Sequence, residues 1–335
     1  MKNRKKEHLE IVKNEYVKHS YNYWDDFVFV HDALPEVNMN EINISTEIFG
    51  KKLAIPLIIA GMTGGFDEAK EINEKLAKIA ERYCIGMGVG SQRAGLEDKS
   101  VEESYSVVKK YDIPLKIANV GAPQLLEWKD AIEKCNEAIE MINADILAIH
   151  LNFLQEVIQP EGERNAKGCL DKIKEISASL QKPVIVKETG AGISKGVVEK
   201  LLDTDIVGID VGGAGGTSFA AVELYRARKI GNKIQEELGK IFWEWGIPTP
   251  YSLIEISEMC REVGITLIAT GGIRHGLDIA RAIALGADAA GVASSLLNSN
   301  MKEKMEVFIA SLKATMFLTG CKNLEELKEA EIWTM

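Results

Sequence analysis

The sequence is short of several features that would assign it to a protein class at once. Its 335 residues include only 5 cysteines and no Cys-x-x-Cys pair, so we expect no disulfide framework and a reducing compartment such as the cytoplasm. None of its 5 histidines stands in a His-Glu-x-x-His pattern, which argues against a zinc hydrolase. No apolar run approaches the roughly 20 residues that cross a bilayer, and the charged start is unlike a secretory signal.

The chain also lacks a surplus of positive charge. Lys and Arg number 40 against 50 Asp and Glu, and the net charge of −10 argues against a nucleic-acid partner. An anionic ligand must therefore be met by a few locally placed cations. The 46% hydrophobic and 27% charged residues are typical of a folded protein and exclude a disordered chain. They provide enough apolar residues for the hydrophobic core of one large barrel or of two medium domains.

Short apolar runs, each followed by a helical pattern, recur about every 30 residues, the length of a strand–helix unit. They are 57–60, 85–89, 115–120, 145–151, 183–187, 205–211, 266–270 and 289–293. Each is nearly continuous in apolar residues, as strands buried on both faces are. Helical patterns lie between them, for example at 67–82, 194–203 and 277–285. Eight such units predict an α/β fold, a (β/α)8 TIM barrel, with a doubly wound open sheet as the alternative.

Two regions lie outside this repeat. Residues 1–55 precede the first strand, hold few periodic apolar positions and are expected to wrap the outside, with a basic arm at their start. Residues 212–250 contain a Gly-rich turn, an amphipathic segment at 219–240 and an aromatic stretch at 242–250, which indicates an insertion after the sixth strand. No linker divides the chain, so residues 1–335 are predicted to form a single domain.

Glycine and polar residues follow every predicted strand. These strand ends are 61–65, 88–93, 119–121, 150–152, 187–190, 212–218, 271–274 and 293–294. Active sites of barrels gather at the C-terminal ends of the strands. A barrel with only a structural role would not need such a rim, so we expect the functional site there.

The ends of the seventh and eighth strands predict a phosphate site, because barrels often bind phosphate at this place. Gly271 and Gly272 let the backbone approach closely, and Arg274 can add a charge-assisted bond. The alternative is that these glycines only shape a tight turn. The loops at 61–65 and 212–217 fit an anion or ring cradle and a flexible turn equally well.

Two further candidates are ambiguous when each is taken alone. Lys187 could neutralise negative charge on a cofactor or a substrate, or it could pair with Glu188. His150 and Asn152 alternate along one strand and so share the face toward the barrel mouth. A lone histidine is nevertheless more often a core residue than a catalyst.

Acidic and basic residues outside the strands are ambiguous too. Glu156 and Glu161 are both candidate Mg²⁺ ligands, although a lone carboxylate in a loop is usually only solvated. Residues 4–8, Arg-Lys-Lys-Glu-His, are by default a solvated basic tail. Composition and spacing therefore lead to a barrel enzyme with a phosphorylated cofactor and an anionic substrate.

Taken together and in order, these motifs resemble those of the type 2 isopentenyl-diphosphate isomerases, which depend on FMN. The matching motifs are Arg-Lys-x-Glu-His at 4–8, Gly-Met-Thr-Gly-Gly at 61–65, Gly-Ser-Gln-Arg at 90–93, Asn119, His-Leu-Asn at 150–152, Gln155-Glu156, Val-Lys-Glu at 186–188, Gly-Gly-Thr at 215–217 and Ala-Thr-Gly-Gly-Ile-Arg at 269–274. The segment 219–250 and the tail after residue 300 carry the least diagnostic residues.

The resemblance implies interconversion of isopentenyl and dimethylallyl diphosphate by 1,3-proton transfer, with reduced FMN as acid and base, Mg²⁺ on the diphosphate, and NADPH or NADH as reductant. It implies FMN contacts from Met62, Thr63, Gly64, Ser91, Asn119, Lys187, Thr217, Gly272, Arg274, Ala293 and Ser294. It assigns the substrate to Arg4, Lys5, Ser91, Gln92, Arg93 and Gln155, catalysis to Gln155, His150 and Asn152, and Mg²⁺ to Glu156, with Glu161 as the alternative. A cytoplasmic homo-oligomer, a tetramer or an octamer, that binds neither nucleic acid nor membrane completes the expectation.

Two other functions fit parts of the rim. An FMN-dependent α-hydroxy-acid oxidoreductase resembles the last two strand ends, but its chemistry needs a basic histidine beside an arginine after strand six or seven. Only His275, next to Arg274, could take that role here. A non-catalytic flavin-binding barrel would have no use for the polar cluster at 150–156.

Overall fold

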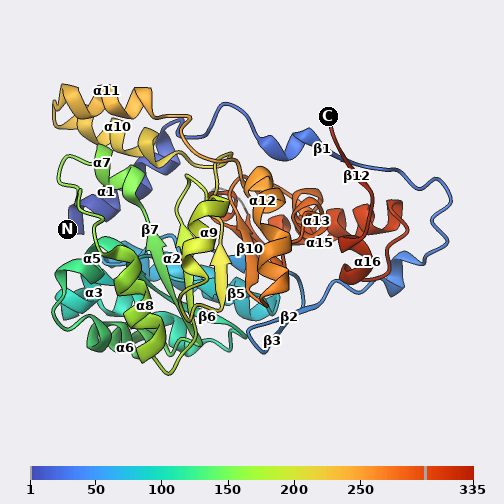
Figure 1. Cartoon of the computed structure of the whole chain (residues 1–335), viewed down its shortest axis with the longest axis horizontal. Coiled ribbons are helices and arrows are strands. Elements are labelled where there is room, and N and C mark those ends of the chain that lie inside the picture. The colour runs from blue at the N-terminus through green and yellow to red at the C-terminus, as the bar shows by residue number, and fades with distance from the viewer. Residues whose placement is uncertain (1, 298–299) are drawn as a thin grey trace.

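The structure, a computed structural model, describes residues 2–297 and 300–335, and eight parallel strands close into a barrel at its centre (Figure 1). In chain order the strands are β4 (Leu57–Ile59), β5 (Gly86–Gly88), β6 (Lys116–Gly121), β7 (Ile146–Leu151), β8 (Val184–Glu188), β9 (Gly208–Asp210), β10 (Thr266–Thr270) and β11 (Ala289–Val292). Each pairs in parallel with its neighbours in sequence, and β11 closes the ring on β4. The predicted (β/α)8 barrel is confirmed, and the open sheet is wrong.

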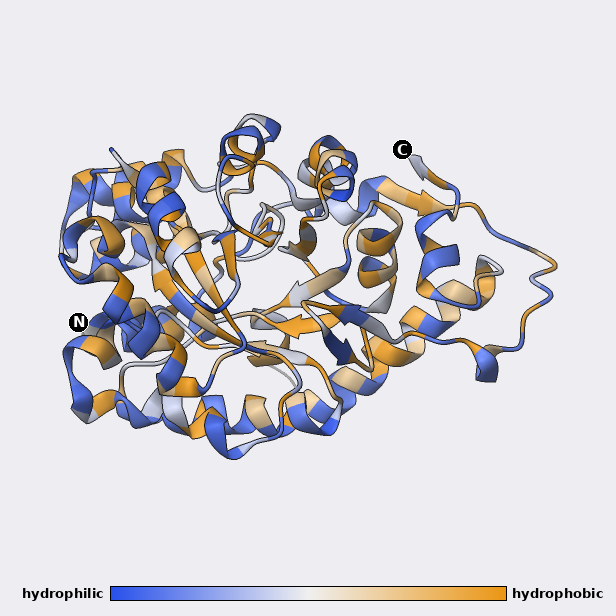
Figure 2. Ribbon diagram, turned by 60° about the horizontal axis from the view of Figure 1, so that its bottom comes forward, coloured by the Kyte–Doolittle hydropathy of each residue, from blue (hydrophilic) through white to orange (hydrophobic). Residues whose placement is uncertain are grey.

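The barrel strands are buried on both faces. Every residue of β4, β6 and β8 is buried, because the barrel interior packs against one face and the helices against the other. In Figure 2 these strands are largely hydrophobic, whereas the surrounding helices alternate between hydrophobic and hydrophilic residues.

Helices follow each strand and cover the barrel. They are α2 (Asp67–Arg82), α3 (Arg93–Glu97), α4 (Glu103–Ser106), α5 (Ala122–Glu127), α6 (Ala131–Ile142), α7 (Phe153–Ile158), α8 (Cys169–Ser179), α9 (Lys195–Leu201), α12 (Thr249–Glu262), α13 (Gly276–Ala284), α14 (Ser294–Leu297), α15 (Met301–Leu318) and α16 (Leu324–Lys328), with the short 3₁₀ helices η3 (Lys99–Val101) and η4 (Val107–Lys110). The three helices expected at 67–82, 194–203 and 277–285 are confirmed as α2, α9 and α13. Among the described residues, no helix is both long and apolar enough for a membrane span.

The N-terminal extension is more ordered than its sequence indicates. Its elements are α1 (Lys2–Asn14), η1 (Tyr23–Asp26), β1 (Phe27–Phe29), η2 (Met39–Glu41), β2 (Thr46–Ile48) and β3 (Lys51–Leu53). Figure 1 shows the blue extension crossing the outside of the molecule from α1 to β1, as expected, and β1 pairs there with β12 (Ile332–Thr334) near the C-terminus. The β2–β3 hairpin was not expected. Its Ile48 and Leu53 pack with barrel residues such as Ile58 and Ile185.

The insertion after β9 forms two helices, α10 (Phe219–Lys229) and α11 (Lys233–Ile241). The predicted amphipathic segment at 219–240 is divided into these two helices, because Gly231 takes a φ of 72° and Asn232 caps α11. Val17 of the extension packs on Ala221 and Val222 of α10. The insertion and α1 therefore form one unit beside α7, at the left of Figure 1.

Candidate active site

The predicted strand-end residues are linked to one another around the barrel mouth by hydrogen bonds. The N–H of Gly90 donates to the carbonyl of Thr63 over 2.9 Å, which ties the end of β5 to that of β4. A Cβ at Gly64 would lie 1.9 Å from the Tyr105 ring, so only glycine fits this turn. Met62 and Thr63 belong to the same turn, at the place expected for a cofactor.

His150 and Asn119 form a buried pair at the ends of β7 and β6. The Nδ1 atom of His150 lies 2.7 Å from Oδ1 of Asn119, whose Nδ2 donates to the Val89 carbonyl over 2.9 Å. The Asn119 oxygen can only accept, so Nδ1 of His150 carries the proton. Burial, with the charges of Lys187 and Lys5, lowers the pKa of His150 to about 3. The imidazole is therefore neutral near pH 7.

The first turn of α7 carries the remaining predicted catalytic residues. Nδ2 of Asn152 donates to Oε1 of Glu156 over 2.9 Å, while Oε2 of Glu156 accepts the N–H of Glu163 over 2.8 Å. The Oδ1 atom of Asn152 is buried without a partner in the described structure. Gln155 points elsewhere, because its Nε2 donates to Glu223 of α10 over 2.9 Å.

Glu223 is a site residue that the sequence reasoning missed. Its side chain is fully buried, with Oε1 2.7 Å from Nε2 of His8 and Oε2 2.7 Å from Arg226. Burial opposes its ionisation, but His8 and Arg226 outweigh burial and lower the pKa of Glu223 to about 2. The same Arg226 binds Glu161 over 2.7 Å, so Glu161 already has a cationic partner. A single buried acid within the insertion has no pattern that reveals it from sequence.

The basic arm reaches the barrel mouth as part of helix α1. Lys5 Nζ donates to the Ser91 carbonyl and, over 2.6 Å, to the hydroxyl of Tyr105. Burial and the nearby charges of Arg4 and Arg93 lower the pKa of Lys5 to about 7. The default expectation of a solvated tail is wrong for Lys5. The structure brings together the three cations assigned to the substrate.

Gln92 and Arg93 are held differently, although they are adjacent. Arg93 lies partly exposed at the start of α3, with its Nε 2.8 Å from Glu97. Gln92 is fully buried, donates to the Ala138 carbonyl and accepts the N–H of Asn119, each over 2.8 Å. The Gln92 side chain therefore joins β6 to α6, and the structure does not present it to the barrel mouth.

Lys187 is nearly buried at the end of β8. Its Nζ donates to the carbonyl of Glu188 over 2.8 Å, and Asp210 is its register partner on β9. The Glu188 carboxylate does not pair with Lys187. Instead it accepts the N–H groups of Thr189, Gly190 and Ala191, while burial raises its pKa to about 7. The Lys187–Glu188 alternative considered from sequence is therefore not a direct ion pair: the hydrogen bond runs to the main chain, and the two charges interact only at longer range.

The loops after β9 and β11 meet through two hydroxyl groups. Oγ1 of Thr217 lies 3.3 Å from Oγ of Ser294. Ala293, another predicted cofactor residue, precedes Ser294 in the chain. Gly272, in the turn between these two loops after β10, has a φ of 75°. These are the predicted cofactor residues of the last three strands, and they lie together as expected from barrel geometry.

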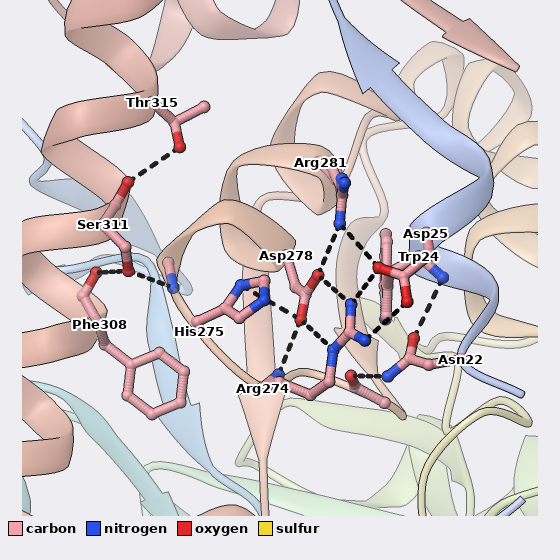
Figure 3. A network of polar contacts seen from close by, with 12 residues as sticks. Asn22, Trp24, Asp25, Arg274, His275, Asp278, Arg281, Phe308, Ser311 and Thr315 are labelled. Carbon is pink, nitrogen blue, oxygen red and sulfur yellow. Dashed lines mark hydrogen bonds and ion pairs between the residues drawn. The ribbon is translucent and has the colours of Figure 1, made fainter. Parts of the chain in front are cut away.

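Arg274 is bound on two sides by carboxylates (Figure 3). Asp25 of the extension accepts from both terminal nitrogens over 2.8 and 2.6 Å, and the fully buried Asp278 accepts from Nε over 3.0 Å. These hydrogen bonds raise the pKa of Arg274 and keep it charged. Its guanidinium contacts acids here, so a direct bond to a phosphate stays a prediction.

The residues present fit a flavin and a magnesium ion. A buried lysine, paired hydroxyl groups and a glycine turn suit a phosphorylated, electron-rich ring system. No group of three or more His, Cys, Asp or Glu capable of holding a metal occurs among the described residues. A lone buried Glu156 beside an orphaned amide oxygen suits Mg²⁺, which usually takes one or two carboxylates together with phosphate oxygens.

Comparison with known proteins adds independent information. The family described as FMN-dependent dehydrogenase matches residues 127–334. The isopentenyl-diphosphate delta-isomerase of Thermoplasma acidophilum is 48% identical over 334 residues, which are 97% of this chain and 94% of that protein. Enzymes of the same name from Picrophilus torridus and Archaeoglobus fulgidus are each 46% identical, over 100% and 98% of this chain and 97% and 95% of theirs.

Proposed function

The chain belongs to the isopentenyl-diphosphate delta-isomerase family, within the FMN-dependent dehydrogenases, and on that premise we propose that it interconverts isopentenyl and dimethylallyl diphosphate in isoprenoid biosynthesis. The observation that carries this proposal is the cation cluster of Arg4, Lys5 and Arg93 beside the flavin-type rim. An acidic protein gathers three positive charges at one mouth only at a free-energy cost, and an anionic substrate offsets it.

The diphosphate would bind between α1 and the start of α3. Lys5 has a pKa lowered to about 7 by burial and like charges, so an incoming anion restores full protonation and gains a charge-assisted bond. Arg4 and Arg93 supply permanent charge, and Ser91 lies beside them. Gln92 supports this group from within the core rather than through its side chain.

Magnesium would be held by Glu156 rather than by Glu161. Glu161 is bonded to Arg226, whereas Glu156 accepts hydrogen bonds only from neutral amide groups among the described residues. Mg²⁺ held there would supply positive charge that offsets the negative charge of the diphosphate. Asn152 holds the Glu156 carboxylate in place through its amide.

The reacting carbons would lie above the flavin, beside His150 and Gln155. The reduced flavin, when bound, supplies an exchangeable proton and an electron-rich ring for the positive charge that develops on the alkene. His150 stays neutral and donates to Asn119, so we assign it to positioning the end of β7 rather than to general-acid chemistry. Gln155 would lie between the reacting carbons and the ionised carboxylate of Glu223, to which it donates a hydrogen bond. Through this bond Glu223 would hold in place the group that accepts a proton from the substrate. Met62, Thr63, Gly64, Ser91, Asn119, Lys187, Thr217, Gly272, Arg274, Ala293 and Ser294 would surround the FMN.

An α-hydroxy-acid oxidoreductase is less well supported. His275, its one candidate base, contacts Asp278 at 3.5 Å and makes no polar contact with the cluster at 150–156 among the described residues. A non-catalytic barrel would not need the cation cluster. Near-full-length identity to three isomerases favours the isomerase over both.

The test is a reductant titration of the purified FMN-loaded protein with Mg²⁺. Substrate and product have the same oxidation state, so one equivalent of reductant, chemical or NADPH or NADH, should support many turnovers. In deuterated water, label should enter the prenyl carbons. Consumption of one NAD(P)H per product, or turnover of lactate or glycolate, would contradict the proposal.

We further propose a single domain over residues 1–335 that assembles as a tetramer or octamer in the cytoplasm. Ile234 and Ile241 of α11, with Trp245 beyond it, are largely exposed and offer an apolar contact. All 5 cysteines are free, which suits a reducing compartment. Light scattering of the FMN-loaded protein measures the oligomeric state, and a monomer would contradict the assembly.

A further inference from the structure

Residues 22–25 of the N-terminal extension hold the turn that follows β10. Nδ2 of Asn22 donates to the carbonyl of Gly272, and Nε1 of Trp24 donates to the carbonyl of Gly271, each over 2.8 Å. Figure 3 shows these side chains beside Arg274. Residues almost 250 positions apart in the chain are thus joined at one rim of the barrel.

These two bonds fix the direction in which the turn presents its amides. The described chain has no cis peptide bond, and in a trans peptide the C=O and the following N–H point in opposite directions. With the carbonyls of Gly271 and Gly272 turned toward the extension, the N–H groups of Gly272 and Ile273 are turned away from it. Neither N–H has a hydrogen-bond partner within the described part of the chain.

The other side of the turn faces the loop after β9. A Cβ at Gly216 would lie only 2.8 Å from the Gly272 nitrogen, so this loop and the amide are in close contact. The next residue is Thr217, whose hydroxyl group lies 3.3 Å from that of Ser294. The unpartnered amides therefore point toward the side of the turn where the hydroxyl groups of Thr217 and Ser294 meet.

The cations of this region are already neutralised. Arg274 bonds to Asp25 and Asp278, and its own N–H donates to Asp278 over 2.9 Å. Arg281 contacts the same two acids, at 3.6 Å from Asp25 and 3.0 Å from Asp278. Asp25 thus anchors the 22–25 segment to α13, and side-chain charge is directed away from the turn.

We propose that Asn22, Trp24 and Asp25 are positioning residues for the phosphate group of the flavin: they aim the N–H groups of Gly272 and Ile273 at it, while Arg274 fixes the frame instead of contacting the phosphate. This inference rests on the proposed FMN site. Its physical basis is preorganisation, because donors that are already oriented lose little conformational entropy when the anion binds.

The experiment compares FMN with riboflavin, which has the same ring but no phosphate. Dissociation constants of both flavins are measured on the apoprotein by quenching of flavin fluorescence. Asn22→Ser keeps the oxygen that caps η1 but is too short to reach Gly272, and Trp24→Phe keeps the ring but loses the indole N–H. Asn38→Ser, at a similar cap of η2, and Trp333→Phe, at an exposed tryptophan, are the matched controls.

We expect each rim variant to weaken FMN binding by about tenfold and riboflavin binding by less than about twofold. The double variant should weaken FMN binding further. The two control variants should bind both flavins as tightly as the unmodified protein does. Unchanged FMN affinity in folded variants, judged by an unchanged melting temperature, would overturn the inference. So would an equal loss of affinity for both flavins, because the segment would then support the pocket and not the phosphate. Failure of the unmodified protein to bind FMN would instead contradict the proposed function.

Discussion

The two anion sites proposed for this barrel are built on opposite physical principles. At the substrate side, Lys5, Arg4 and Arg93 repel one another, and the pKa of Lys5 falls to about 7. At the flavin side, Arg274 is surrounded by Asp25 and Asp278, and its pKa rises. At the first site Lys5 has no acidic partner within ion-pair distance among the described residues, although Arg93 is bonded to Glu97. The second site pairs its cations with carboxylates and presents backbone amides.

This difference suits ligands with different residence times. A substrate that enters and leaves every turnover is attracted by side-chain charge that becomes fully matched only when the anion arrives. A cofactor that stays bound is held more tightly by a rigid frame of oriented N–H groups, because the conformational entropy of ordering them was already lost when the chain folded. Each of the following predictions separates the two sites.

The largest effect is expected from Gly272→Val. The residue has a φ of 75°, and a Cβ there would lie 3.0 Å from the Gly215 carbonyl oxygen and 3.2 Å from Trp24. The valine should turn the N–H groups of the turn away from the phosphate. FMN affinity should then fall by about a hundredfold or more, because two charge-assisted hydrogen bonds are lost. Flavin content of the purified protein measures this.

The control for that variant is Gly231→Val. Gly231 has a similar φ of 72° in the turn between α10 and α11, with open space around its Cβ position. It carries the same backbone strain without the phosphate turn. Equal flavin loss in both variants would show that strain alone is responsible.

The next effect concerns the substrate side. Lys5→Ala should raise the KM for the diphosphate by about tenfold to a hundredfold and change flavin content much less, because the lysine has no hydrogen bond to the 271–274 turn among the described residues. Lys6→Ala is the matched control, since Lys6 is exposed and bonded to Glu68. A KM equal to that of the unmodified protein would return the arm to a solvated segment.

A smaller, pH-dependent effect follows from the same lysine. Lys5 is protonated below its pKa of about 7, so kcat/KM should fall several-fold as the pH rises from 6 to 8.5. Lys5→Arg, which stays charged, should flatten this limb of the profile. A limb that persists in the arginine variant would assign the ionisation to another group.

The smallest effect is expected at Asp25. Its bonds to Arg274 lower its pKa below the ordinary value of 3.8, so its stabilising contribution is present above that pH and is lost as the pH falls through the folded-state pKa. Asp25→Asn should therefore lower the free energy of unfolding at pH 7 by less than about 1 kcal/mol, because the ion pair is half exposed. This change is measured as a slightly lower melting temperature. The difference between the proteins should shrink as the pH falls through the lowered pKa of Asp25, and a difference that stays constant with pH would exclude the ion pair as its cause.

Much of this architecture follows from local sequence. The eight apolar runs became barrel strands because a strand between a packed interior and a helix layer needs apolar residues on both faces. The polar residues behind them had to meet at one rim, since parallel strands all end on the same side. His150, Asn119, Thr217 and Ser294 are found there for that reason.

The same reasoning could not reveal Glu223, Asp25 or the β2–β3 hairpin. Glu223 lies in the amphipathic segment at 219–240, and its ion pairs need both Arg226 on the same helix and His8 from the N-terminal extension. Gln92 was assigned to the substrate by its motif, yet its amide is bonded within the core. A motif gives a residue's place in the chain but not the direction of its side chain.

The sequence by itself therefore determined the strand–helix units, the rim and the types of group available there, because these depend on periodicity and on strand ends. The closure of the strands into a barrel is seen only in the tertiary structure. The tertiary structure alone decided which charges are matched. Arg274 finds Asp25 across 249 residues, and Lys5 finds Tyr105 across 100. Such long-range pairs leave no pattern in the chain, because their geometry exists only after the extension has folded over the barrel mouth.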